Sequence, residues 1–145
     1  MKKNKITFWG VRGSFPTPDS DKINFGGDTS CVSIETANQI LILDMGTGVR
    51  KLGQKIMSSP NSPKIINIFL SHYHWDHMFG LLMFAPLFSD KYEINIYGKN
   101  DRLKLKDIIK HMLNPIFWPA SFNDFKAKLN LHTIEDRSEE RRVGK

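Results

Sequence analysis

The sequence predicts an α/β domain in which strands and helices are layered together. Apolar runs of strand length, at 40–43 and 65–70, alternate with an amphipathic stretch of helix length at 49–57. A hairpin pattern also stands beside strand–helix units, which excludes a pure helix bundle or a pure β-sandwich. With 145 residues, of which 40% are hydrophobic and 25% charged, the chain has the size and composition of one globular domain.

Local signals place the first elements of this domain. Residues 6–9 form a strand that ends at Gly10, and residues 11–28 form a loop rich in Gly, Pro, Asp and Ser. A structureless loop of that length is uncommon in a compact domain and suggests a function. Alternation over 31–36, a turn and the apolar run 40–43 predict a hairpin.

The rest of the chain alternates between helices and strands. Gly46 and Gly48 open a helix, and as glycines they permit backbone conformations closed to other residues. Their Gly-Thr-Gly string lacks the lysine and spacing of a phosphate-binding P-loop. The predicted helices are 49–57, 78–84 and 101–112, the last capped by Asp101, and the predicted strands are 65–70, 93–97 and 126–133.

Cysteine and apolar content define the environment. The single cysteine, Cys31, cannot form an internal disulfide, and in a strand it is expected to be a small core residue rather than a nucleophile. The amino terminus lacks the apolar segment of a signal peptide. The longest apolar run, residues 78–88, is too short to span a bilayer. We therefore expect a cytoplasmic protein with no membrane partner.

The net charge of +6 says little about partners. Most of it comes from the two ends of the chain, because residues 6–136 hold 14 basic and 13 acidic side chains. A dedicated nucleic-acid surface would cluster Lys and Arg within the fold. Nucleic acid is therefore a possible partner that the charge does not support.

A compact group of polar side chains follows the predicted strand 65–70. His72, His74 and His77 lie within six residues of one another, with Asp76 among them. On extended backbone, His72 and His74 project to the same side. Imidazole nitrogens and carboxylate oxygens are ligands for zinc, iron and manganese. The alternative is a polar surface loop, but packed imidazoles repel when protonated and lack a structural use without metal. The pattern predicts a metal site.

The string His72-Tyr73-His74-Trp75-Asp76-His77 matches the HxHxDH motif of the metallo-β-lactamase-fold hydrolases. The likeness extends over roughly residues 5–120. It resembles the branch of the carbon–phosphorus-lyase accessory phosphodiesterases and, more distantly, the tRNA 3′-processing ribonucleases. Asp28 departs from the asparagine that this branch usually has there. The strings that carry the resemblance are FWGVRGSFPTP, FGGDTSC, LILDMGTGVRKLG and FLSHYHWDHMFGLLMFAPLF.

The resemblance implies a fold and a ligand set. The fold is the amino-terminal half of an αββα sandwich, with a mixed sheet and flanking helices. Two divalent metal ions, zinc first and manganese or iron as options, would be held by His72 with His74 and by Asp76 with His77. Asp76 would also orient the bridging hydroxide that two close metals can hold as a nucleophile.

Other residues have roles around this centre. Asp44 matches the family aspartate that ends an apolar strand. It would orient a ligand imidazole by accepting a hydrogen bond from it, or cap the following helix. Arg12 is a candidate substrate contact through its planar guanidinium, or a solvated loop residue. His111 and His132 are expected at the surface rather than as ligands. Candidates to line a substrate mouth are Phe84, Phe88, Phe117 and Trp118.

Three functions compete. The leading one is hydrolysis of a small phosphodiester or nucleotide-like substrate by a dinuclear centre. The first rival keeps the fold and cleaves a carboxylic ester, lactone, lactam or thioester. The second is a metal-binding regulatory module without turnover. The oligomeric state is open, with a homodimer as one option.

The resemblance also predicts that the chain is a fragment. Residues 1–136 would form a partial domain with four of the family's usual seven ligand positions, inactive by itself. The last residues, 137–145, read RSEERRVGK and resemble the translation of a sequencing adapter, or form a disordered tail.

Overall fold

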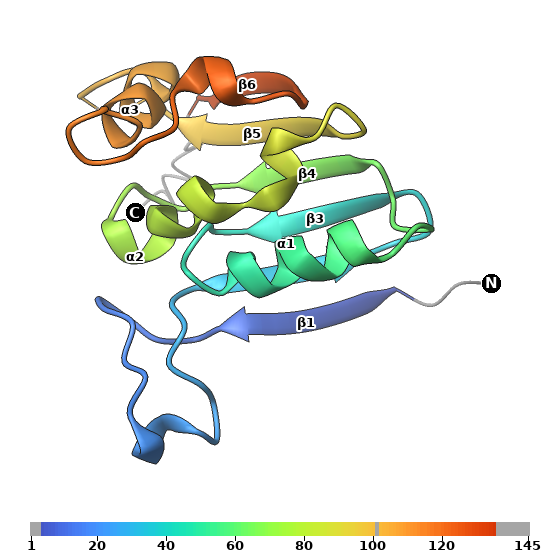
Figure 1. Ribbon diagram of the computed structural model, residues 1–145, viewed down its shortest axis with the longest axis vertical. Helices are drawn as coiled ribbons and strands as arrows, with labels where there is room; N and C mark the ends of the chain where they lie inside the picture. Colours follow the sequence, from blue (N-terminus) through green and yellow to red (C-terminus); the bar gives the residue numbers. More distant parts are fainter. Residues whose placement is uncertain (1–3, 101, 136–145) are drawn as a thin grey trace, which may run out of the picture.

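A computed structural model describes residues 4–100 and 102–135, and within them the chain forms one six-stranded mixed sheet with helices (Figure 1). The strands are β1 (Lys5–Gly10), β2 (Cys31–Glu35), β3 (Gln39–Leu43), β4 (Ile65–Phe69), β5 (Glu93–Lys99) and β6 (Lys128–Ile134). The α-helices are α1 (Val49–Ser58), α2 (Trp75–Met78) and α3 (Leu105–Met112), and the 3-10 turns are η1 (Ser20–Lys22), η2 (Phe79–Met83), η3 (Ala85–Phe88) and η4 (Phe122–Asp124). The predicted α/β fold is confirmed.

Strand order follows the chain from β1 to β6. The first three strands pair antiparallel, whereas β3, β4, β5 and β6 pair in parallel. Consequently β1 runs in the same direction as β3 to β6, and the arrowheads of β1, β3 and β5 point to one side in Figure 1. The loops that follow β1, β3, β4 and β5 therefore meet at one edge of the sheet, where open α/β sheets place their sites.

One face of the sheet carries the core. Isoleucines at alternate positions of β3, β4 and β5 are buried, for example Ile42, Ile68 and Ile96, which are register partners across the three strands. Helix α1 lies across this face (Figure 1) and contributes Val49 and Leu52 to the same buried cluster. Alternation in the strands and helical spacing in α1 thus produce one continuous core.

The opposite face is open and carries both apolar and polar side chains. Ile6 is 62% and Phe8 69% exposed, although both lie in a strand. Polar residues of this face bond one another across the strands: Asn67 donates to Gln39, and Asn95 donates to Asn67. The side-chain amides of this open face thereby satisfy one another's hydrogen-bonding groups.

Two helix predictions need correction. In place of one helix over 78–84, α2 ends at Met78 and 3-10 turns follow, because the Gly80 N–H donates to the Met45 carbonyl at 2.8 Å and ties that backbone to the neighbouring loop. The helix predicted over 101–112 begins at Leu105. Asp101, its expected cap, lies outside the described residues.

The remaining predictions on chain organisation have limited structural counterparts. Residues 137–145, expected to be an adapter artefact or a tail, lie outside the described residues. Within the described part, no helix is long and apolar enough to cross a bilayer. Cys31 is fully buried, as expected of a core residue, and burial raises the pKa of its thiol to about 12. It is therefore a thiol at neutral pH and not a nucleophile.

Glycine is required where the loop after β3 meets the loop after β4. A Cβ atom at Gly46 would lie 2.4 Å from the Asp76 carbonyl oxygen and 2.6 Å from the Ser30 nitrogen. Neither Gly46 nor Gly48 has a positive φ, so neither uses the conformational freedom that glycine permits. What these two glycines supply is space for backbone to pack on backbone.

We expect Gly46→Ala to lower the free energy of unfolding by about 1–3 kcal/mol, because the new methyl group overpacks a junction of two backbones. Urea denaturation followed by circular dichroism measures the change. Gly13→Ala is the matched control, since a Cβ at Gly13 meets nothing within 4 Å. Equal stability of the two variants would contradict the packing argument.

Candidate metal centre

The four predicted ligands come together on the loop after β4. His72 and His74 are exposed on extended chain, and α2 then turns the backbone so that Asp76 and His77 face the same region. The His72 ring lies 4.5 Å from that of His74 and 4.1 Å from that of His77, measured between centroids. The loop therefore gathers three imidazoles and one carboxylate at the carboxyl edge of the sheet.

Asp44 holds His77 from the end of β3. The Nδ1–H of His77 donates to the Asp44 carboxylate at 2.8 Å, because a carboxylate can only accept. This bond leaves Nε2 of a neutral His77 as the atom with a free lone pair. Such a carboxylate–imidazole contact is the usual support of a metal-bound histidine.

Ser71 extends this support to His72. Its backbone N–H donates to Asp44 Oδ1 at 2.8 Å, and its hydroxyl lies 2.8 Å from Asp44 Oδ2 and 3.0 Å from His72 Nδ1. The single hydroxyl proton goes to the carboxylate, so Ser71 Oγ accepts from His72 Nδ1–H. One buried carboxylate thus orients two imidazoles.

Asp76 is held from the opposite side by the loop after β1. The Ser14 backbone N–H donates to Asp76 Oδ2 at 2.8 Å, and this bond, together with the nearby His77, holds the pKa of Asp76 below its ordinary value. The same oxygen lies 3.4 Å from Nε2 of His77. Asp76 is therefore an anion poised beside a ligand-type nitrogen.

The donors suit a divalent metal in chemistry and orientation. Two Nδ1 atoms are engaged with the protein, which leaves the corresponding Nε2 atoms for a metal. Among residues 4–100 and 102–135, however, no group of three or more His, Cys, Asp or Glu side chains is arranged to hold a metal ion as it stands.

Arg12 does not contact this loop in any bond that the structure records. Its Nε donates to Thr17 Oγ1 at 3.0 Å, and its side chain lines a hollow with Asp21 and Lys22. Its role as a substrate contact stays a prediction. Asp28, the departure from the family pattern, lies 2.8 Å from Lys51 Nζ, so its charge is balanced locally.

The candidate aromatic residues separate into two groups. Phe84 is fully buried in the core, and Phe88 packs edge-on against Phe125. Phe117 is 78% exposed and lines a hollow beside the metal loop together with Trp75. Of the four predicted residues, Phe117 thus lines a hollow beside the metal loop, whereas Trp118 packs partly buried against the core.

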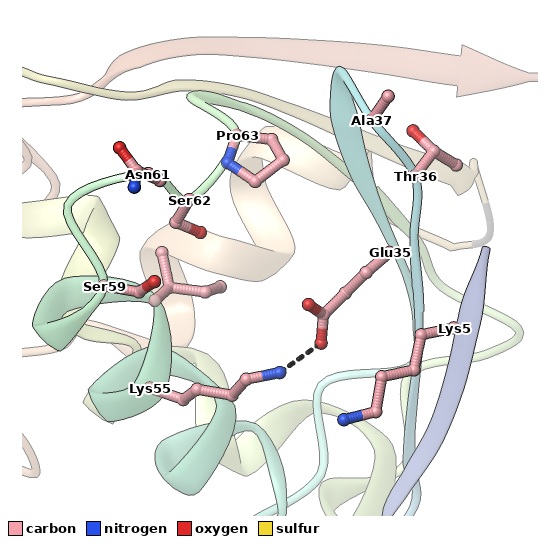
Figure 2. A pocket seen from close by; sticks show the side chains of 10 residues that line it. Lys5, Glu35, Thr36, Ala37, Lys55, Ser59, Asn61, Ser62 and Pro63 are labelled. Atoms are coloured by element: carbon pink, nitrogen blue, oxygen red, sulfur yellow. Dashed lines mark hydrogen bonds and ion pairs between the residues drawn. The ribbon is translucent and has the colours of Figure 1, made fainter. Parts of the chain in front are cut away.

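A second hollow, of about 290 Å³, lies at the opposite edge of the sheet (Figure 2). Lys5 and Lys55 point into it from β1 and α1, and Lys55 is paired with Glu35. It borders the turn between β2 and β3 rather than the loops that meet at the ligand edge. It is therefore separate from the candidate metal centre.

Sequence reasoning missed Ser71 and Ser14. Ser71 directly precedes the histidine string, and that position was the only available signal for it. Ser14 has φ of 67° and Asp44 has φ of 60°, conformations that are uncommon for residues other than glycine. Strained backbone of this kind clusters at functional sites.

Comparison with known proteins finds curated relatives whose sequences match most of the length of this chain. Ribonuclease Z of Picrophilus torridus is 33% identical over 134 residues, covering 90% of this chain and 37% of the relative. Ribonuclease Z of Pyrococcus abyssi is 27% identical over 122 residues, covering 82% of this chain and 36% of the relative. The chain thus spans well under half the length of the curated relatives it matches.

Solved structures share the fold at lower identity. A diphosphatase from the PhnP family superposes with a TM-score of 0.61 at 18% identity, covering 91% of this chain and 50% of that one. Human tRNase Z, short form, gives a TM-score of 0.57 at 24% identity, covering 90% of this chain and 45% of that one. These two likenesses confirm the fold.

The family model of the Metallo-beta-lactamase superfamily matches residues 24–99. That stretch is more than half of the 145 residues and contains Asp44 and all four predicted ligands. The chain therefore belongs to the metallo-β-lactamase superfamily.

Proposed function

We propose that this chain contributes to a metal-dependent hydrolase of phosphodiester bonds whose substrate is a small phosphodiester or a nucleotide. The observation that carries the proposal is the imidazole cluster oriented by Asp44, in a chain whose curated relatives are ribonucleases Z. Ribonucleases cleave phosphodiester bonds, and the superfamily implies divalent metal ions.

His72 and His74 would hold one divalent ion, and Asp76 and His77 a second, with zinc favoured by the imidazole-rich set. When bound, such ions supply Lewis acidity toward a phosphoryl oxygen and lower the pKa of water. Asp44 keeps the His77 ring in place, and Asp76, anionic and held by Ser14, is the group able to orient an attacking water.

The number of donors limits what these residues do alone. The resemblance implies seven ligand positions, and the described residues offer four. We propose that residues 1–145 bind metal weakly and turn over no phosphodiester by themselves. Activity would then require ligands from outside these residues.

The first prediction from the proposed function concerns the metal content of the chain. His72→Ala or Asp76→Ala should lower the zinc retained per chain after equilibrium dialysis, because each removes a donor from the cluster. His132→Ala is the matched control, since His132 stacks on Tyr97 at 4.5 Å and lies outside the cluster. If zinc retention were the same in all three variants, the ligand assignment would be wrong.

The second concerns the carboxylate behind the ligands. Asp44→Asn keeps the shape of the side chain but removes the charge that accepts from His77 and Ser71, so zinc affinity should fall about 10–100-fold. Competition with a fluorescent chelator measures the affinity. Asp28→Asn, which removes a carboxylate charge that pairs with partly exposed Lys51 and accepts from the Thr47 hydroxyl, should change it less than about threefold. Equal losses would assign the effect to charge alone.

The third concerns the bond that is cleaved. Residues 1–145 and the complete reading frame that contains residues 1–136 are assayed side by side with bis-para-nitrophenyl phosphate, a 2′,3′-cyclic nucleotide, a lactam and a thioester. We expect turnover only in the longer protein, highest kcat/KM for the phosphodiesters, and loss of activity with a chelator. A larger kcat/KM for the lactam or thioester supports the carbonyl rival, and metal binding without any turnover supports the regulatory module.

A further inference from the structure

An apolar hollow adjoins the candidate metal centre. Its volume is about 340 Å³, and it lies between the loop after β4 and helix α3. Tyr73 and Trp75, which alternate with the predicted ligands in sequence, form one wall. The full lining consists of Tyr73, Trp75, Met78, Leu103, Ile108, His111, Met112 and Phe117.

The chemistry of the lining selects the kind of group that fits. Four of the side chains are rings, and none is a Lys, Arg, Asp or Glu. Trp75 is 63% exposed and Phe117 78% exposed, so two large aromatic faces remain available on its walls. Rigid exposed aromatics beside a polar reaction centre are the usual platform for stacking a flat ring.

The His111 ring in the lining offers one hydrogen-bond acceptor that could orient a bound group. The Nδ1–H of His111 donates to the Asp107 carbonyl at 2.6 Å, since a carbonyl oxygen only accepts. A neutral His111 therefore keeps Nε2 as a hydrogen-bond acceptor, which suits an amino or imino N–H of a base. Tyr73 is held in its wall by a bond from its hydroxyl to the Lys99 carbonyl.

We propose that this hollow binds the nucleobase of a nucleotide substrate. The inference rests on the proposed function for the phosphate end and assigns the uncharged end of the same molecule. The uncharged lining matches a base and offers nothing to a phosphate, whereas the histidine cluster beside it suits the phosphate through metal. A pocket of this size and apolar character takes a small ring system.

Trp75 also borders a smaller hollow of about 230 Å³ with Phe15 and Phe79. Phe15 is 73% exposed, nearly as much as Phe117. The two phenylalanines therefore provide a matched pair of variants, because Phe117 lines the hollow of about 340 Å³ and Phe15 lines the hollow of about 230 Å³.

The test is calorimetric titration of the 145-residue chain with adenosine in EDTA, which removes any contribution from metal. We expect saturable binding, weakened about tenfold or more in Trp75→Ala and in Phe117→Ala, and changed less than about twofold in Phe15→Ala. Trp75→Phe keeps a ring and should stay within about threefold of the parent chain. Ribose 5-phosphate should not bind in EDTA.

Adenosine that fails to saturate, or that binds equally well to Trp75→Ala, overturns the proposal. Loss of binding in Phe15→Ala with retention in Phe117→Ala overturns it in favour of the smaller hollow. Repeating the titration with zinc and adenosine 5′-monophosphate separates the two ideas. Failure of the phosphodiesterase proposal alone leaves adenosine binding in EDTA intact and removes any gain in affinity from zinc.

Discussion

The ligand edge depends on one buried carboxylate. Asp44 directly follows β3. Its carboxylate accepts from the Ser71 backbone N–H, just beyond β4, and from the His77 ring. Its own backbone N–H donates to Phe69, and the next residue, Met45, donates to the His77 carbonyl. A carboxylate side chain that is only 11% exposed would be costly to bury unpaired, and the hydrogen bonds that compensate for its burial also join the two loops.

Topology explains why loops far apart in sequence reach this carboxylate. The strands β1, β3, β4 and β5 share a direction, so their following loops converge at one edge. The loop after β1 is anchored there because the Asp28 carbonyl accepts from Val11 and Arg12, and its Ser14 then reaches Asp76. Both non-glycine residues with positive φ among the described residues, Ser14 and Asp44, sit in these converging loops. Strain is concentrated where the ligands are positioned.

The sequence was sufficient for what periodicity and motif spacing encode. Apolar runs and alternating patterns predicted the strands to within a few residues, and the histidine string predicted the position of the ligand loop. It could not predict bonds made by backbone, such as Ser14 N–H on Asp76, because any residue type offers that donor. It also could not predict the packing at Gly46, since a Cβ that would lie 2.4 Å from a carbonyl oxygen is a tertiary contact with no local signature. The prediction of a helix over 78–84 was wrong for the same reason, since the Gly80 N–H donates to the Met45 carbonyl rather than within its own helical turn.

Charge distribution bears on the size of the substrate. Binding of long RNA relies on many Lys and Arg contacts to phosphates, and residues 6–136 hold 14 basic against 13 acidic side chains. Several of the lysines are already paired, as Lys51 is with Asp28 and Lys55 with Glu35. The hollow beside the ligand loop has room for one ring system rather than a row of stacked bases. On the proposed function, these residues would hold one nucleotide at its base and its phosphate rather than a long RNA.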